Sequence, residues 1–164
     1  MNIFEDVREF ARVAQSANIN NQGLLSTLLL CKNLIAEESQ ETLDALAKYK
    51  GSPSLENLTE AVDGAIDTIY VCAFFLNQMG LNSEAHWKLV QERNMAKFPD
   101  GKVLKNEYGK VVKPAGWYPP DHLPLLIEWN SQRQGATYVG GMMKHGQSSH
   151  DQQSSTSVET PERN

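Results

Sequence analysis

Apolar residues recur every three to four positions through the first hundred residues, and this spacing is typical of amphipathic helices. Asn2, Ser54 and Ser83 stand where they can accept hydrogen bonds from the first turns of three of these helices. A polar break at residues 18–22 ends the first helix, and glycine or proline ends the other three. The expected helices cover residues 3–17, 24–50, 55–79 and 84–98. We therefore expect an all-α protein, a bundle of four to five helices.

The helical pattern gives way to other signals after residue 101. Residues 102–104 and 110–113 flank a turn over residues 106–109 that contains Gly109, which predicts a small C-terminal β-hairpin. Residues 114–124 are rich in proline and should run extended before a last apolar turn at 125–129. Residues 131–164 are rich in Ser, Gln, Gly and Thr and poor in core formers. We expect one ordered domain over residues 1–130 and a flexible tail over 131–164.

Length and charge exclude several classes of protein. A chain of 164 residues can build one core, and its net charge of −5 argues against a nucleic-acid-binding protein. No apolar run reaches the roughly 18 residues of a membrane span, and no signal peptide is evident, so we expect a cytoplasmic protein without a membrane partner. Cys31 and Cys72 lie at apolar helix positions without paired ligand spacing. We expect both thiols in the core.

Acidic residues at helical spacing interrupt the apolar pattern of the second and third helices. Glu37, Glu38 and Glu41 form one stripe, and Asp63 and Asp67, one turn apart, form another. Facing stripes of carboxylates repel unless a divalent cation neutralises them, and Mg²⁺ prefers oxygen ligands. The pattern favours a magnesium site. The alternative is a solvated acidic helix face.

Asn94 and Lys97 lie three residues apart near the end of the fourth helix. An amide and an ammonium on one face can together hold the oxygens of a metal-bound polyphosphate. The alternative is a lysine that only complements the helix dipole.

The order of these motifs resembles the all-α nucleoside triphosphate pyrophosphohydrolases, in particular the phage and bacterial MazG-like and phosphoribosyl-ATP pyrophosphohydrolase-like branch. The resemblance spans residues 5–125. It rests on Glu37-Glu38-x-x-Glu41, Asp67, Asn94-x-x-Lys97-Phe98, Asp100-Gly101-Lys102-Val103, Gly109-Lys110 and Tyr118-Pro119-Pro120-Asp121. The family's second acidic motif is Glu-x-x-Asp, and this chain has Gly64 in place of its glutamate. Asp63 is the candidate replacement, which leaves the number of bound metal ions open.

The resemblance implies a homodimer or homotetramer that hydrolyses a nucleoside triphosphate between its α and β phosphates, using Mg²⁺ or Mn²⁺. Catalysis would involve Glu37, Glu38, Glu41 and Asp67. Of these, Glu38, Glu41 and Asp67 would hold metal together with Asp63, and Glu37 would hold or deprotonate the attacking water. The phosphates would contact Asn94, Lys97 and Lys102, although Lys102 can also be a solvent-exposed hairpin residue. Phe10, Gln15 and Asn18 could stack on and hydrogen-bond a nucleobase; they could equally be a core residue and loop caps.

Three functions are compatible with these residues. A purine triphosphate such as dGTP or GTP is the first reading, in which the enzyme trims a bacterial or phage nucleotide pool. Phosphoribosyl-ATP or an alarmone such as ppGpp is the second. A non-catalytic helical binding module that retains a residual metal site is the third, and Gly64 in the altered motif is the argument for it.

Overall fold

The structure is a computed structural model that describes residues 2–16, 18 and 20–145, with side chains as far as residue 134. The helices are α1 (Ile3–Val13), α2 (Leu24–Gly51), α3 (Leu55–Gln78), α4 (Ser83–Met95), the short 3-10 helix η1 (Pro99–Gly101) and α5 (Leu123–His145). No β-strand forms within the described residues, so the all-α prediction is confirmed there. None of these helices is both long and apolar enough to cross a membrane.

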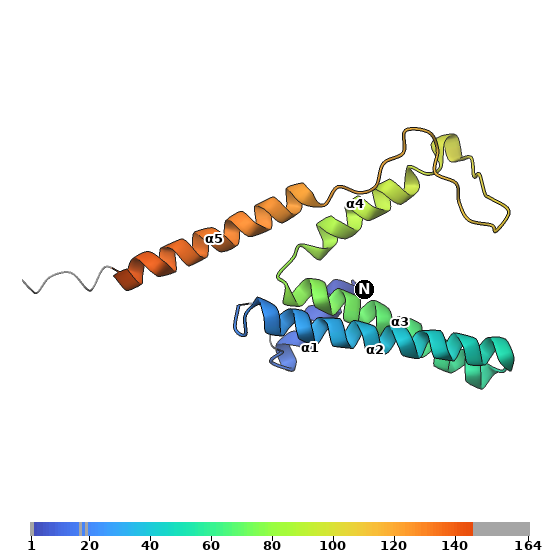
Figure 1. Ribbon diagram of the computed structural model, residues 1–164, viewed down its shortest axis with the longest axis horizontal. Helices are drawn as coiled ribbons and strands as arrows, with labels where there is room; N and C mark the ends of the chain where they lie inside the picture. The colour runs from blue at the N-terminus through green and yellow to red at the C-terminus, as the bar shows by residue number, and fades with distance from the viewer. Residues whose placement is uncertain (1, 17, 19, 146–164) are drawn as a thin grey trace, which may run out of the picture. The chain divides into compact units, whose positions relative to one another are not determined.

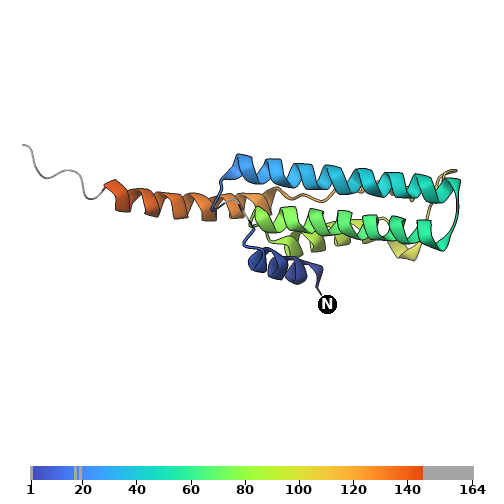
Figure 2. The ribbon, with the colours of Figure 1, turned by 90° about the horizontal axis from the view of Figure 1, so that it is seen from below.

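Helices α2 and α3 form a long antiparallel pair (Figures 1 and 2). At the turn between them, Ser54 caps α3 by accepting from Asn57 N at 3.1 Å. Midway along the pair, a Cβ added at Gly64 would lie 3.1 Å from Thr42 Oγ1 and 3.2 Å from Thr42 Cα. Beside this point the hydroxyls of Thr42 and Thr68 lie 2.8 Å apart. Small residues therefore set how closely the two helices approach.

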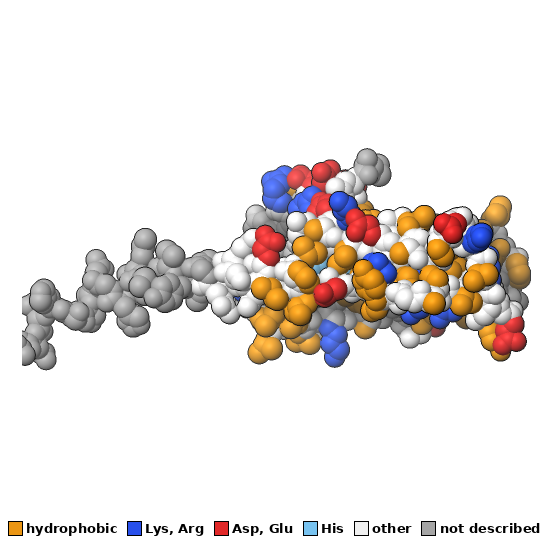
Figure 3. Space-filling model, turned by 90° about the horizontal axis from the view of Figure 1, so that it is seen from above, with side chains coloured by type: hydrophobic (Ala, Val, Ile, Leu, Met, Phe, Trp, Pro, Cys, Tyr) orange, Lys and Arg blue, Asp and Glu red, His pale blue; other side chains and the backbone are white. Residues whose placement is uncertain are grey.

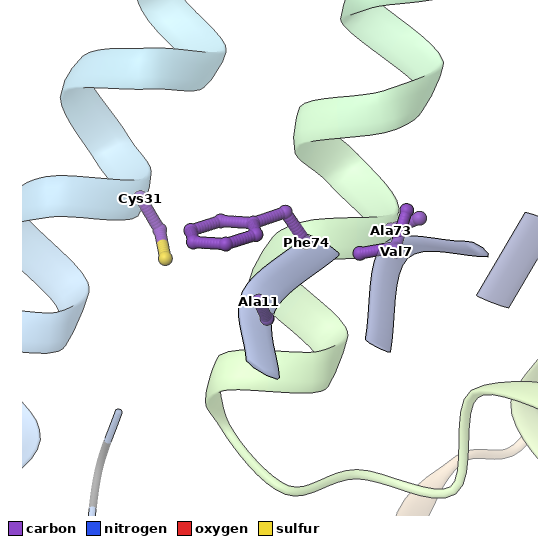
Figure 4. Packing of buried hydrophobic residues seen from close by; sticks show 5 residues of the cluster. All are labelled: Val7, Ala11, Cys31, Ala73 and Phe74. Atoms are coloured by element: carbon purple, nitrogen blue, oxygen red, sulfur yellow. The ribbon is translucent and has the colours of Figure 1, made fainter. Parts of the chain in front are cut away.

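Helix α1 packs against the C-terminal half of α3 and completes a small core (Figure 4). The core joins Val7 and Ala11 of α1, Cys31 of α2, and Ala73 and Phe74 of α3. The structure corrects one prediction, because Cys31 is buried but Cys72 is exposed.

Helix α4 is joined to α1 by polar and aromatic contacts. Arg8 Nη2 donates to Glu84 Oε1 at 2.8 Å, and the rings of Phe4 and Trp87 meet edge to face with their centroids 6.2 Å apart. The cap predicted at Ser83 lies one residue earlier. Asn82 caps α4 by accepting from Ala85 N at 3.1 Å, and Ser83 is the first helical residue.

The predicted β-hairpin is not supported. Residues 102–113 form a turn closed by one antiparallel bridge between Lys105 and Val111, with Val112 N donating to Leu104 O at 2.8 Å. Gly109 occupies a positive φ of 75° at this turn, which explains why a glycine stands there. One bridge leaves the flanking residues without ladder partners, so no strands form.

The last helix is longer than the sequence indicated. α5 reaches His145, so residues 131–145, which we expected in a flexible tail, are helical. Residues 146–164 of that tail lie outside the described part of the chain. By its contacts the chain divides into one unit over Met1–Leu126 and another over Ile127–Asn164. The domain boundary at residue 130 stays a prediction, and all site residues considered below belong to the first unit.

Candidate active site

The five predicted carboxylates lie on the paired helices, with Glu37, Glu38 and Glu41 on α2 and Asp63 and Asp67 on α3. The contact between Thr42 and Thr68 fixes the register, so that the middle of α2 lies beside the middle of α3. Glu38 is half-buried, whereas the other four carboxylates are exposed. Glu38 is therefore the acid that points closest to the seam between the helices.

The surroundings of Glu38 disfavour its charge. Burial raises the pKa of the Glu38 carboxyl most, and the negative charges of Glu41, Asp67, Glu37 and Asp63 raise it further, in that order. Acids from both helices thus act on one group. A bound divalent cation would neutralise the repulsion among these carboxylates.

The donors fit a hard cation by their chemistry, since all five are carboxylates. Their spacing is open, however. Among the described residues, no three or more His, Cys, Asp or Glu side chains lie close enough together to hold a metal ion by themselves. Mg²⁺ tolerates such openness, because it commonly keeps several waters and completes its shell with substrate phosphates.

Asn94 and Lys97 meet at the C-terminal end of α4. Lys97 Nζ donates to Asn94 Oδ1 at 2.7 Å, so the predicted pair does share one face. Lys102 lies beyond η1 and is exposed. Within the part of the chain that the structure describes, no hydrogen bond or ion pair joins these residues to the carboxylates of α2 and α3. The phosphate-binding roles stay predictions.

The three predicted base-binding residues have different surroundings. Phe10 is 52% exposed, and its ring centroid lies 5.7 Å from that of Tyr70 and 6.4 Å from that of Phe74, both in edge-to-face arrangements. Gln15 is exposed and has a positive φ of 49°, which reverses the chain after α1. Asn18 organises the following loop, since its Oδ1 accepts from Asn20 N at 2.9 Å.

Asn18 also lines a cavity of about 200 Å³ between the end of α1, the following loop and the end of α3. Amide and guanidinium groups dominate the lining. The lining residues are Arg8, Ala11, Arg12, Ser16, Asn18, Asn20, Asn77, Gln78 and Gly80. Gln78 is 1% exposed, and among the described residues none accepts a hydrogen bond from its Nε2. Such a buried donor leaves a hydrogen bond available for a bound molecule or water.

Sequence reasoning missed Arg8, Arg12, Asn77 and Gln78 in this cavity. Two signals could have found them. Arg8 and Arg12 lie one turn apart on α1, and two amides end the otherwise apolar third helix. Neither signal shows by itself that the two helix ends meet, because that depends on how α1 packs on α3.

The model of the phosphoribosyl-ATP pyrophosphohydrolase family matches residues 4–94, which is more than half of the chain. No curated protein matches the sequence. The matched region holds all five carboxylates, the predicted base-binding residues and Asn94. Lys97 and Lys102 lie beyond it.

Proposed function

The chain belongs to the phosphoribosyl-ATP pyrophosphohydrolase family, within the MazG-like nucleoside triphosphate pyrophosphohydrolase superfamily, and we infer that it hydrolyses a nucleoside triphosphate between the α and β phosphates. A purine substrate such as dGTP or GTP would give the monophosphate and pyrophosphate. One observation carries the proposal: Glu38 lies half-buried at the α2–α3 seam, and four other carboxylates act on its charge.

Glu38, Glu41, Asp67 and Asp63 would hold the metal. When bound, Mg²⁺ or Mn²⁺ would neutralise charge on the phosphates and polarise the bond that breaks. Exposed Glu37 would hold the attacking water and take its proton as the water oxygen bonds to the α phosphorus. The bond from that phosphorus to the bridging oxygen breaks, and pyrophosphate leaves with the electron pair. Asn94, Lys97 and Lys102 would contact the phosphate oxygens through their N–H donors.

The cavity beside Asn18 is the candidate site for the nucleoside end. Its volume of about 200 Å³ is below the roughly 300–1,000 Å³ of sites for drug-sized ligands, so it suits a single base or sugar. Amides can donate to and accept from a base edge at once, and buried Gln78 Nε2 offers an unused donor. Phe10 and Gln15, from the same end of α1, would border the bound base.

We propose that the enzyme is a homodimer or homotetramer, because α3 carries an apolar stripe away from α2. Its members follow helical spacing and are all exposed in the single chain. They are Leu55, Leu58, Val62, Ile66 and Ile69. Further leucines of α2 are exposed as well, and Figure 3 shows hydrophobic side chains spread over one face of the molecule. Contiguous apolar surface of this kind marks an interaction site, and a second copy of the helical pair offers a matching stripe.

The family description favours a second substrate, phosphoribosyl-ATP, whose hydrolysis uses the same bond and the same residues. An alarmone such as ppGpp is a further candidate. The non-catalytic binding module remains the contrasting proposal, since Gly64 replaces the second-motif glutamate.

A panel of substrates tests these proposals together. The full-length protein with Mg²⁺ is offered all ribo- and deoxyribonucleoside triphosphates, phosphoribosyl-ATP and ppGpp, and pyrophosphate and orthophosphate release are measured separately. We expect pyrophosphate from a purine triphosphate, and a loss of at least about 100-fold in Glu41→Gln, because a metal ligand contributes to transition-state charge stabilisation.

Glu56→Gln is the matched control, because it removes one carboxylate from the first turn of α3, away from the acidic stripes. It should leave turnover unchanged. If pyrophosphate is released only from phosphoribosyl-ATP or ppGpp, that compound replaces a nucleoside triphosphate as the proposed substrate. No release from any compound would favour the binding module.

A further inference from the structure

A cluster of three cations surrounds one aromatic ring beyond the end of α4. Trp117 has Lys113 Nζ at 4.5 Å, Lys97 Nζ at 5.3 Å and Arg93 Cζ at 5.9 Å from its ring centroid. Arg93 also stacks on Tyr118 at 3.6 Å. Cations at such distances are attracted to the faces of aromatic rings.

Two hydrogen bonds fasten this cluster to α4. Trp117 Nε1 donates to Arg93 O at 2.8 Å, and Arg93 Nε donates to Tyr118 O at 3.0 Å. The proline-rich segment is thus tied to the helix end at two points. Trp117 is half-buried by this arrangement, so its ring holds a fixed place among the cations.

Carboxylates do not balance the charge of the cluster. None of the ion pairs within the described residues includes Arg93, Lys97 or Lys113. The stretch from Arg93 to Tyr118 carries six basic and two acidic residues, although the whole chain has a net charge of −5. Like charges gathered in this way repel each other, and a bound anion would remove the repulsion.

We propose that Trp117 and Tyr118 gather Arg93, Lys97 and Lys113 into a binding site for linked phosphates, either the polyphosphate chain of a nucleotide or free pyrophosphate. The guanidinium and the two ammonium groups supply charge-assisted donors, and the rings set their spacing. Trp117 is a positioning residue. The proposal rests on the proposed function only in giving Lys97 a phosphate contact.

The arrangement favours a compact phosphate chain over single-stranded nucleic acid. Proteins of the latter class stack bases on open aromatic faces. Here Arg93 lies over Tyr118 at 3.6 Å, and Lys113 lies over Trp117 at 4.5 Å. One face of each ring is therefore occupied by a cation, which favours recognition of charge over stacking of bases at this cluster.

Calorimetric titration of the metal-free, full-length protein with inorganic tripolyphosphate tests the site. Without metal, the carboxylates of α2 and α3 repel the probe, so binding reports on basic side chains, and the variants show which of them take part. We expect Lys113→Gln and Trp117→Leu each to weaken binding about tenfold, equivalent to about 1.4 kcal/mol. Lys105→Gln, which removes the same charge from the same loop but away from Trp117, should change binding less than about twofold.

Titration with nucleoside triphosphate, nucleoside monophosphate, pyrophosphate and orthophosphate identifies the source of the phosphates. Triphosphate and pyrophosphate should bind, while the monophosphate and orthophosphate should bind at least about tenfold more weakly. If Lys113→Gln and Lys105→Gln weaken tripolyphosphate binding equally, the cluster attracts the probe only through nonspecific charge. Equal binding of orthophosphate, tighter binding of a thymidine oligonucleotide, or no binding at all would also overturn the proposal.

Far-UV circular dichroism checks that Trp117→Leu folds, and Lys113→Gln tests the same site without altering packing. The result of the metal-free binding titration does not depend on whether the protein hydrolyses a nucleotide. Binding without pyrophosphate release in the substrate panel would count against the proposed function alone. Release without metal-free binding would count against this inference alone.

Discussion

Glu38 combines partial burial with four neighbouring negative charges, and both raise its pKa. The folded protein therefore holds more protons on this group than the unfolded chain at pH values between the ordinary glutamate pKa and the raised one. Stability must fall as pH rises through that window. We expect metal-free Glu38→Gln to melt at a higher temperature than wild type above the window, and at a similar temperature below it.

Thermal melts in chelator across pH 4.5 to 7.5 measure this effect. Adding Mg²⁺ should raise the wild-type melting temperature, since the ion binds only the folded state, and should raise that of Glu38→Gln much less. Glu56→Gln is again the control. A variant that melts below wild type without metal would show that Glu38 stabilises the seam, contrary to the electrostatic argument.

At the residue level, spacing predicted which acids share a helix face but not which one meets the seam. Glu38 and Glu41 are equivalent in the motif, and only the packing of α2 on α3 makes Glu38 the half-buried one. The same limit applies to Gln78, which the sequence shows at the end of a helix and the structure shows lining a cavity. Tertiary contacts decide both.

At the scale of helices, the close approach at Gly64 makes a specific prediction. An alanine Cβ there would lie 3.2 Å from Thr42 Cα and 3.3 Å from Thr42 N, which are backbone atoms that cannot rotate away. Gly64→Ala gains about 1 kcal/mol in helix propensity, but overpacking costs about 1–3 kcal/mol. We expect a net loss of about 1 kcal/mol in the free energy of unfolding.

Urea denaturation measures this loss. Gly51→Ala is the matched control, because a Cβ at the end of α2 meets nothing within 4 Å. It should leave stability unchanged or slightly higher. If both substitutions stabilise the protein equally, the helices can separate without cost, and Gly64 does not set their approach.

The four main helices were predictable because their apolar spacing, caps and glycine stops agree with one another. The caps at Asn2 and Ser54 are confirmed. Helix α5 was missed, because Pro124 suggested an extended segment although proline is tolerated in a first helical turn. Gly135, Gly140 and Gly141 then lowered helix propensity further. The hairpin failed for a different reason, since two short segments without a third strand seldom hold a ladder.

At the scale of the whole molecule, the stripe on α3 predicts the oligomer. Ile69 is 52% exposed in the single chain, and burying it between two copies would favour association. A lysine there would place a charge in the interface. We expect Ile69→Lys to weaken association by at least about tenfold, measured by sedimentation equilibrium.

Leu104→Lys is the control, because Leu104 is 64% exposed in the loop beyond η1 rather than on the stripe. It should associate as wild type does. Equal weakening by both substitutions, or a wild type that stays monomeric at tens of micromolar, would contradict the assignment of the stripe to a second copy.

The seam at Gly64 also bears on how this acidic motif could evolve. Glutamate at that position needs more room than alanine, and the atoms in the way belong to the backbone of α2 as well as to Thr42 Oγ1. A glutamate introduced there alone would therefore force the two helices apart. Relatives that carry the glutamate should differ at several seam positions at once, including those of Ala61 and Thr68. The motif of this chain is in that sense tied to the packing of α2 on α3, and a glutamate at position 64 would require coordinated substitutions along the seam.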